Sequence, residues 1–462
     1  MGDFMYTDIY QDDFIWGCDL SGEYLIGLDL GTTNIKGIIM TTGGKTVGET
    51  SLPVSYNIGS EGKVEYCGED FFINVAKLIK KLVENIEGDV KGISMVSASG
   101  NTILLNGNNR PIRPIISWLD KRFTDEAESI FVNPYNYYDI IGWPFNNTFP
   151  LAHLSWLKLN EPENYDSANK ICMVTDYVNY RLTGCLATNP STATTFYLQD
   201  QENACWYSDI LSKLNIDEVQ LPEIISSGEI IGHINEESAT LTGLRLGTPV
   251  IAGSFDHPGA ARGTGVLKDG DLLLSCGTSW VGFYPCENRK KLISLGMLVD
   301  PFLKDGPYAG MFSLPRIGNH IDSIIKKWIS PSEDRYKLFN DYAAAGQKGL
   351  SLNPMIDSDR DFGGYSKEQI SLALMEGTAL LMKEKIDFYA KNGLKIENIV
   401  IAGGPTRSEL WLSILGDILK NEINAAGSHA GAKGAAIMAG IGYGIYIDEF
   451  DVLKKGVCDG TI

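Results

Sequence analysis

The chain has 462 residues, of which 44% are hydrophobic and 21% charged, the proportions of an ordinary globular protein with room for at least two cores. Its 39 Lys and Arg residues against 58 Asp and Glu give a net charge of −19, which argues against nucleic acid or an anionic membrane as a partner. Apolar runs all fall short of the roughly 20 residues that span a membrane.

Cysteine and histidine usage indicates the compartment. The eight cysteines form no C-x-x-C pair and the five histidines no H-x-x-x-H pair, so a zinc site is not expected. Cysteines of this kind in a long chain are typical of reduced thiols, which predicts a cytoplasmic protein. Residues 1–23 hold six acidic residues and no Lys or Arg. A signal peptide needs a basic start and an apolar core, so this segment is interpreted as an acidic extension.

Strands and helices are expected to alternate along the whole chain. In the first half we expect strands over 24–40 and 44–56, a helix over 69–87, a buried strand over 92–97, helices over 151–159 and 175–182, and a strand over 246–253. In the second half we expect a strand pair over 271–284, a helix over 369–389, a strand over 396–404, and helices over 408–419 and 431–446. This alternation predicts an α/β protein. We place one domain at 24–253, a second at 254–447 and a tail at 448–462.

Two glycine turns read alike. Gly31-Thr32-Thr33 and Gly277-Thr278-Ser279 each stand between two apolar strands. Glycine lets a backbone bend closely around a ligand, hydroxyl groups add donors, and consecutive amides form an anion-binding concavity. Two such turns about 250 residues apart predict two domains that bind one polyphosphate. The chain has neither a Walker A loop nor a G-x-G-x-x-G string after a strand.

Two carboxylates accompany these turns. Asp29 stands in an apolar strand two residues before Gly31, where it can orient Mg²⁺ near phosphates; the alternative is a hairpin with a chance Asp. Asp256 follows an apolar strand and precedes a small-residue helix. It can accept a proton from an attacking hydroxyl, or it can simply be an N-cap.

A third glycine pair, Gly403-Gly404, follows a strand and precedes a helix. Such a turn can accept the sugar and base of a nucleotide, with Arg407, Ser408 and Trp411 nearby. A helix-start turn with a core tryptophan is the competing interpretation.

The ordered set of motifs resembles the FGGY carbohydrate kinases, a group that includes xylulose, ribulose, glycerol and gluconate kinases. The resemblance runs from about Tyr24 to Tyr446 and depends on residues 27–36, 115–122, 175–184, 242–256, 275–279, 402–411 and 431–436. The first motif is shared with actin, Hsp70 and hexokinase, but the ordered set is specific to FGGY kinases. The literal string Phe362-Gly-Gly-Tyr365 carries no weight.

This resemblance implies two actin-like, RNase H-like domains flanking a deep cleft, with ATP mostly on the C-terminal domain and sugar mostly on the N-terminal one. It implies Asp256 as general base and Mg²⁺ at Asp29 and Asp256. The expected ATP and phosphate contacts are Thr32, Thr33, Lys36, Gly277, Thr278, Ser279, Gly403, Gly404 and Arg407. The expected substrate contacts are Asn101, Thr102, Trp118, Asp120 and Asp256, although a core tryptophan with a solvated aspartate would also explain Trp118 and Asp120.

The chain departs from the family where substrate is selected. Xylulose kinases usually have Gln-Met-His after the strand at 92–97 and glycerol kinases Gln-Arg-Glu-Thr, whereas this chain has Ser97-Ala-Ser-Gly-Asn-Thr102. His257 stands where glutamine is more usual.

We therefore predict ATP-dependent phosphorylation of a sugar or polyol hydroxyl, with a xylulose-like ketose among the candidate acceptors and a homodimer among the candidate assemblies. One alternative is a sugar- and ATP-binding regulator on a kinase scaffold with weak catalysis. Another is an actin- or chaperone-like ATPase acting on protein.

Overall fold

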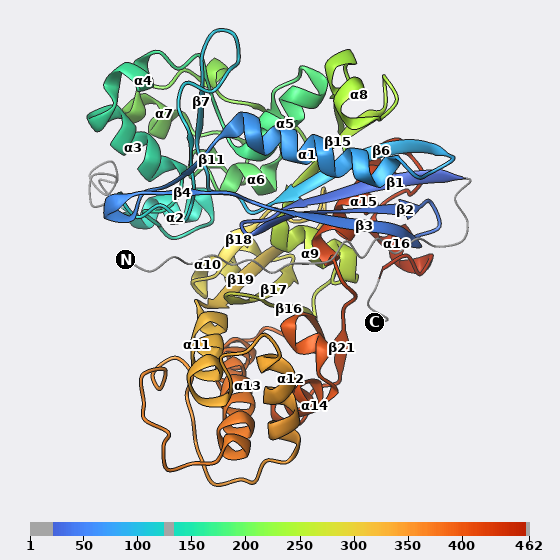
Figure 1. Ribbon diagram of the computed structural model, residues 1–462. Coiled ribbons are helices and arrows are strands. Elements are labelled where there is room, and N and C mark those ends of the chain that lie inside the picture. Colours follow the sequence, from blue (N-terminus) through green and yellow to red (C-terminus); the bar gives the residue numbers. More distant parts are fainter. Residues whose placement is uncertain (1–21, 124–133, 459–462) are drawn as a thin grey trace.

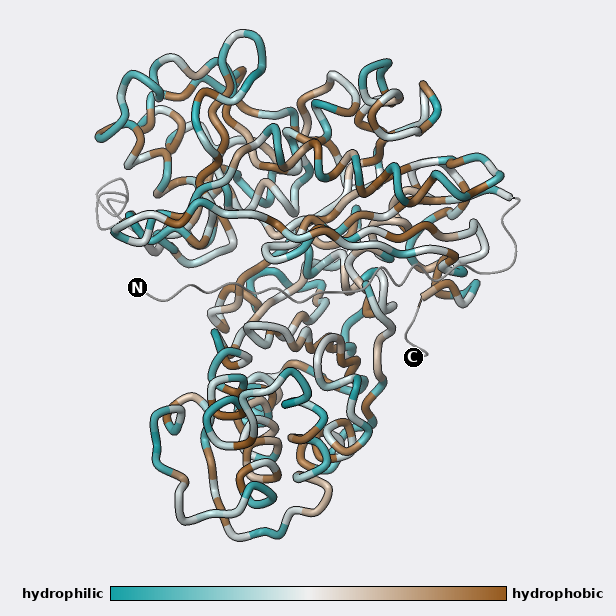
Figure 2. The backbone as a smooth tube through the Cα atoms, viewed as in Figure 1, coloured by the Kyte–Doolittle hydropathy of each residue, from teal (hydrophilic) through white to brown (hydrophobic). Residues whose placement is uncertain are grey.

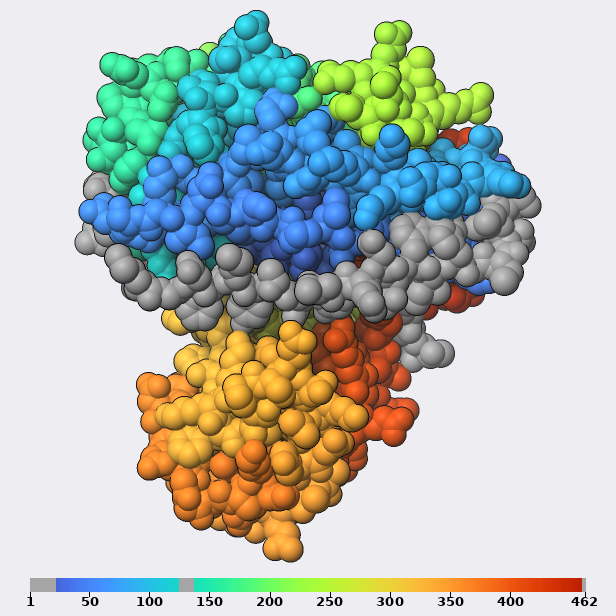
Figure 3. All heavy atoms as spheres, viewed as in Figure 1, coloured from blue at the N-terminus to red at the C-terminus, as the bar shows by residue number. Residues whose placement is uncertain are grey.

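The protein consists of two α/β bodies, each built on a six-stranded sheet (Figure 1). The computed structural model describes residues 22–123 and 134–458, so most of the acidic extension and the last four residues of the tail lie outside the description. In Figure 3 the N-terminal half, coloured blue to green, forms the broad upper body, and the C-terminal half in orange and red forms the narrower lower one. The predicted α/β class is confirmed.

The N-terminal sheet takes its strands from the first 255 residues. In spatial order they are β14 (Ile230–His233), β15 (Pro249–Phe255), β6 (Asp89–Ser97), β1 (Glu23–Leu30), β2 (Asn34–Thr41) and β3 (Thr46–Pro53). β1, β2 and β3 are antiparallel neighbours, while β6 runs parallel to both β1 and β15. The parallel strands end at one edge of the sheet, which brings residues from distant parts of the sequence together.

The C-terminal sheet repeats this plan. Its strands in spatial order are β18 (Leu298–Asp300), β19 (Tyr308–Leu314), β17 (Trp280–Cys286), β16 (Asp271–Cys276), β20 (Asn398–Gly403) and β21 (Ile423–Ala425). β16, β17 and β19 are antiparallel neighbours, and β20 runs parallel to β16 and β21. Both sheets thus contain three antiparallel strands followed by two parallel ones. The sixth strand lies at different edges: β14 lies beside the parallel strand β15 in the first sheet, and β18 lies beside the antiparallel strand β19 in the second. The strands predicted at 24–56, 92–97, 246–253, 271–284 and 396–404 are confirmed.

Helix α1 (Gly68–Val83) covers the outer face of the N-terminal sheet with an apolar stripe. Its side chains Phe72, Val75 and Leu78 lie on one stripe and are fully buried in the core with β1 and β2. Gly37 of β2 allows close contact, because a Cβ there would lie 2.5 Å from a Leu78 methyl. Figure 2 shows the apolar residues concentrated along the strands of both bodies. The helix predicted over 69–87 is confirmed, ending four residues earlier.

Two helices of small residues, α9 (Asp256–Thr264) and α15 (Ala430–Tyr443), pack together next to the inner face of the N-terminal sheet. A Cβ on Gly27 would lie 1.8 Å from the Ala432 carbonyl oxygen, and one on Gly434 would lie 1.8 Å from that of Gly259. Only glycine permits this approach of backbone to backbone. α9 and α15 both follow residue 253 but pack against the N-terminal sheet, so the domain boundary at 253/254 stays a prediction.

The distal end of the C-terminal half is helical. It consists of α11 (Ile317–Ile324), α12 (Arg335–Ala344), α13 (Lys367–Lys391) and α14 (Glu409–Leu419). The N-cap residue of α13 is Ser366, whose hydroxyl accepts from the Gln369 amide in a capping box, a start signal that can be recognised in the sequence. Helices predicted over 151–159, 175–182, 369–389, 408–419 and 431–446 correspond to α3 (Pro150–Asn160), α5 (Val174–Thr183), α13, α14 and α15. Within the described ranges, no helix combines the length and apolar character of a membrane span.

Candidate active site

The carboxyl ends of three parallel strands bring the two predicted carboxylates together. β1 pairs with β6 so that Asp29 lies opposite Val96, and β6 pairs with β15 so that Ser97 lies opposite Phe255. Asp256 is the next residue and the first of α9. Two carboxylates more than 200 residues apart in sequence therefore lie at one edge of one sheet.

Asp29 lies in a polar environment that contains both signs of charge. Its antiparallel partner across β2 is Lys36. A Cβ on Gly431 would lie 3.0 Å from its Oδ2, so α15 begins against this carboxylate, where helix amides favour an anion. Burial raises the pKa of Asp29 to about 6; the Lys36 ammonium opposes this shift and the Asp256 charge adds to it. The two carboxylates thus repel each other through space, an arrangement that a bound cation would relieve.

Asp256 lies in the first turn of its helix and does not cap it. The N-cap residue is Phe255, and Asp256 Oδ1 accepts instead from the backbone amide of His257 at 2.7 Å. The His257 Nε2 atom lies 3.9 Å from the same oxygen. Burial raises the pKa of Asp256, while the neighbouring His257 side chain and backbone amide oppose the shift. The carboxyl is thus oriented through one oxygen, and a raised pKa makes it a stronger proton acceptor.

The first glycine turn carries Thr32 and Thr33. The Thr32 carbonyl accepts from the Tyr56 hydroxyl at 2.8 Å, and its Oγ1 accepts from Trp118 Nε1 at 3.0 Å. Thr33 is exposed, and its carbonyl accepts from the Val54 amide at 2.9 Å. The turn is therefore held from the protein side, which leaves the exposed Thr33 side open to a ligand.

The second glycine turn lies against the start of α11. The Ser279 hydroxyl accepts from the Arg316 amide at 2.9 Å, and the Thr278 carbonyl accepts from the Gly318 amide at 2.9 Å. Gly277 and Thr278 are exposed. As in the first turn, backbone and hydroxyl groups are fixed on one side and face solvent on the other.

The third glycine site adjoins the second turn. Gly403 ends β20 opposite Cys276 of β16. Its φ is +99°, and a Cβ would lie 2.4 Å from the Cys276 carbonyl oxygen, so only glycine fits. Gly404 and Arg407 are exposed close by. Trp411 belongs to the core instead, because it is buried against Trp280, and the competing interpretation holds for that residue.

A small cavity of about 10 Å³, room for about one water molecule, lies next to the first turn and contains some of the predicted substrate residues. It is lined by Thr32, Tyr56, Asn101, Ser117, Trp118 and apolar neighbours. Asn101 is almost fully buried, and its Oδ1 accepts from the Val174 amide at 2.6 Å. Tyr56 was missed from the sequence, where it is one of 21 tyrosines in the chain with no motif around it. A larger groove of about 440 Å³, lined by segments 83–91 and 243–249, contains none of the predicted site residues.

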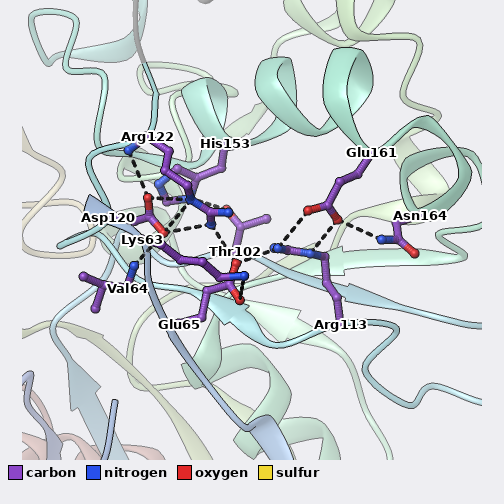
Figure 4. Close-up of polar contacts among 10 residues, drawn as sticks. All are labelled: Lys63, Val64, Glu65, Thr102, Arg113, Asp120, Arg122, His153, Glu161 and Asn164. Carbon is purple, nitrogen blue, oxygen red and sulfur yellow. Dashed lines mark hydrogen bonds and ion pairs between the residues drawn. The ribbon is translucent and has the colours of Figure 1, made fainter. Parts of the chain in front are cut away.

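Thr102 and Asp120 do not line this pocket. Thr102 is buried, and its hydroxyl bonds His153 Nδ1 at 2.9 Å (Figure 4). Asp120 is fully buried, and its Oδ2 accepts from the Val64 amide at 2.9 Å while Arg122 binds both of its oxygens. The solvated-aspartate interpretation is therefore wrong, and substrate contacts by Thr102 and Asp120 stay a prediction.

Asp120 belongs to a buried ionic cluster that holds the segment carrying Trp118. Arg122 also donates to Glu65 at 2.7 Å, and Arg113 joins Glu65 to Glu161 (Figure 4). Burial alone would raise the pKa of Glu65, but the guanidinium of Arg113 and the other cations lower it below its usual value. Removing one member would leave a charge buried and unpaired, which is costly. The cluster therefore supports the segment that carries Trp118, and none of its members lines the pocket.

Comparison with known proteins decides the family. The N-terminal domain model of the FGGY family of carbohydrate kinases matches residues 24–263, and the C-terminal domain model of that family matches residues 338–443. The chain belongs to the FGGY family of carbohydrate kinases. It is therefore an enzyme that phosphorylates a sugar with ATP, as the motifs predicted.

Relatives of similar length support this family. The xylulose kinase of Bacillus subtilis is 27% identical over 91% of this chain and 89% of its own length. The gluconokinase of Bacillus licheniformis is 23% identical over 94% and 90%.

Among solved structures, a ligand-bound xylulose kinase from Lactobacillus acidophilus superimposes with a TM-score of 0.83 at 23% identity, covering 94% of this chain and 92% of that one. The Plasmodium falciparum glycerol kinase with ADP gives 0.84 at 19% identity, covering 96% and 94%. At these identities the structures show the fold, and they confirm the pair of actin-like domains.

Proposed function

We propose that the acceptor is a neutral ketose of the xylulose type. The chemistry of the pocket beside the first turn supports a neutral acceptor, and the xylulose kinases among the relatives support a ketose. The polar groups of the pocket are two phenols, an amide, an indole and two hydroxyls, all uncharged. The nearby guanidinium groups of Arg113 and Arg122 are engaged by Glu65, Asp120 and Glu161. A sugar acid would need a cation, whereas a neutral polyhydroxyl compound needs only these hydrogen-bonding groups.

We assign the acceptor proton to Asp256. Its Oδ1 is fixed by the His257 amide, which leaves Oδ2 to accept the proton as the sugar oxygen attacks the γ-phosphorus of ATP. The exposed faces of the two glycine turns, through Thr32, Thr33, Gly277, Thr278 and Ser279, would donate to phosphate oxygens. Lys36 adds positive charge beside Asp29.

We assign the nucleotide to the C-terminal half. Gly403 and Gly404 would pack against the sugar and base, and the exposed Arg407 would add a positive charge at the same edge. These residues adjoin the second turn through the pairing of β16 with β20. The phosphate chain of ATP would then extend from the C-terminal half toward Asp29 and Asp256.

Asp29 and Asp256 fit a Mg²⁺ ion. Mg²⁺ takes oxygen ligands and is usually bound by one or two carboxylates together with substrate phosphates. The mutual repulsion of Asp29 and Asp256 is the expected property of such a pair. When bound, the ion would neutralise charge on the phosphate oxygens during transfer.

A panel assay tests this function. ADP formation is measured with ATP and pentuloses, aldoses, polyols or sugar acids as acceptors. We expect a ketose to give the highest kcat/KM. A sugar acid as the best acceptor would contradict the neutral pocket.

The same panel separates the regulator and the protein-directed ATPase. Sugar binding without turnover would indicate a regulator, and ATPase activity stimulated by unfolded peptide instead of sugar would indicate an action on protein. Both glycine turns and both carboxylates are in place, and no feature of the site favours either alternative.

A further inference from the structure

The backbone that carries Asp256 is held by a buried side chain from another element. β15 ends at Phe255, and its amide donates to the hydroxyl of Ser191 at 3.1 Å. Ser191 is fully buried on the short helix α6 (Pro190–Thr194). This hydrogen bond fixes the Ser254–Phe255 peptide, one peptide unit before the one that leads into Asp256, where the strand becomes helix α9.

The Ser191 hydroxyl is itself fixed by a carboxylate from the C-terminal sheet. It donates to Asp300 Oδ2 at 2.7 Å, and Asp300 is the last residue of β18 and fully buried. A hydroxyl has one proton and two lone pairs. Because the proton goes to Asp300, a lone pair is directed at the Phe255 amide. Asp300, Ser191 and Phe255 therefore form one continuous chain that ends beside Asp256.

Among the described residues, the Asp300 side chain makes one hydrogen bond, to Ser191, and lies within reach of the Arg262 charge. Its Oδ1 has no hydrogen-bond partner among the described residues. Burial raises its pKa to about 7, against the opposing effects of the Ser191 hydrogen bond and the Arg262 charge. A buried, incompletely partnered carboxyl costs stability. Its presence therefore calls for a function.

β18 is anchored so that Asp300 stays beside Ser191. The backbone of Val299 donates to the Gly142 carbonyl at 2.8 Å and accepts from Trp143 Nε1 at 2.9 Å and Gln201 Nε2 at 2.7 Å. The Trp143 ring also contacts the Phe255 ring, with centroids 5.8 Å apart. An edge strand of the C-terminal sheet is thereby fixed to the N-terminal half next to the base.

We propose that Ser191 and Asp300 are positioning residues that hold the Asp256 carboxylate in line for proton transfer, with Asp300 orienting the Ser191 hydroxyl. This inference rests on the proposed role of Asp256 as base. A base displaced by about 1 Å can cost up to 10²-fold in rate, which sets the scale of the effect. Both residues are fully buried, so in this arrangement they act through Asp256.

The test compares kcat and KM of Ser191→Ala with those of Ser238→Ala. Ser238 is a matched control, because it is also fully buried and its hydroxyl donates to a backbone carbonyl, that of Arg181, on α8 (Glu236–Thr242). We expect Ser191→Ala to lower kcat about 10-fold with the KM for ATP unchanged. Ser238→Ala should keep the kcat of the parent. Equal kcat values in the two folded variants would overturn the proposal.

Asp300 supplies the second comparison. In Asp300→Asn the amide oxygen can still accept from Ser191, so kcat should stay within about threefold of the parent, whereas Asp300→Ala should resemble Ser191→Ala. This pair decides the question if Ser191→Ala does not fold. Equal kcat values for Asp300→Ala and the parent would contradict the proposal.

A double variant separates positioning from general damage. If Ser191 acts through Asp256, adding Ser191→Ala to Asp256→Asn should lower kcat by less than about twofold further. A full, additive loss would show that Ser191 acts elsewhere. Near-parental turnover of Asp256→Asn alone would instead refute the proposed base, an outcome distinct from failure of the Ser191 comparison.

Discussion

The two sheets share a strand plan but place different chemistry at corresponding positions. Asp29 of β1 stands two residues before Gly31, and at the same point of β16, before Gly277, the residue is Ser275. β15 is followed by Asp256, whereas β21, its counterpart in the second sheet, ends at Ala425. Both carboxylates thus come from the N-terminal half.

This asymmetry has a physical reason. The chain has a net charge of −19, so its overall field repels ATP. In the C-terminal half β16, β20 and β21 end in amides, hydroxyls and glycines without a carboxylate, so this edge can hold a polyanion without added repulsion. The N-terminal half, which holds the carboxylates, provides the proton acceptor and the cation site. The two halves share a strand plan, but in the proposed assignment the C-terminal half binds the nucleotide and the N-terminal half provides the carboxylates for proton and cation.

The largest expected effect on kcat comes from removing the proposed base, which belongs to the N-terminal half alone. Asp256→Asn should lower kcat by about 10²–10⁴-fold while ATP binding persists, because proton acceptance is lost and the nucleotide contacts lie elsewhere. Steady-state kinetics and calorimetric ATP titration measure the two effects. Asp176→Asn is the control, since Asp176 also has a raised pKa but lies on α5 and is more deeply buried than Asp256. Near-normal turnover of Asp256→Asn would remove Asp256 from the base role.

A carboxylate can be added to the C-terminal sheet at Ser275, the position that corresponds to Asp29. Ser275→Asp places a negative charge beside the second glycine turn, where it would repel the phosphates. We expect the KM for ATP to rise about 10-fold, or about 1.4 kcal/mol. Ser275→Asn, of the same size without the charge, should change it far less. If both variants shift KM equally, shape and not charge governs this position.

The glycine contact between β16 and β20 is specific to the nucleotide side. In Gly403→Ala the new Cβ would meet the Cys276 carbonyl oxygen at a positive φ, so unfolding free energy should fall by about 1–3 kcal/mol and ATP binding should weaken. Gly364→Ala is the control, because a Cβ there meets open space. Chemical denaturation of both variants checks the expectation. A fully stable Gly403→Ala would mean that the strands separate at no cost.

The sequence predicted the helices, strands and turns better than the long-range contacts between their side chains. The long helix α13 has a readable cap at Ser366, and the glycine turns have a local signature. The burial of Asp120 has no such signature, because the residue that shares its arginine, Glu65, lies 55 positions earlier in the chain. Positioning of the base through Ser191 and Asp300 depends on elements more than 100 residues apart. Such contacts follow from tertiary packing, which local patterns do not encode.

The smallest expected effect concerns the stability contribution of Asp176, a carboxyl with a raised pKa and no proposed role in catalysis. Burial raises the pKa of Asp176 from 3.8 to about 7 although the Met173 amide hydrogen bond opposes it. The folded state therefore binds a proton that the unfolded state has lost, and this residue's contribution to stability disappears as pH rises from about 4 through 7. Asp176→Asn should be relatively more stable at pH 8 than at pH 4, compared with the parent. Denaturant titrations at both pH values measure this; no pH dependence of the difference would contradict the assigned pKa.

The stoichiometry of the products tests the division of labour most directly. With ATP and the best acceptor of the panel, ADP and phosphorylated sugar are quantified together with inorganic phosphate. Transfer controlled by Asp256 predicts one sugar phosphate for each ADP, little inorganic phosphate, and loss of both products in Asp256→Asn. ADP accompanied by inorganic phosphate, at a rate independent of the sugar and of Asp256, would contradict the account.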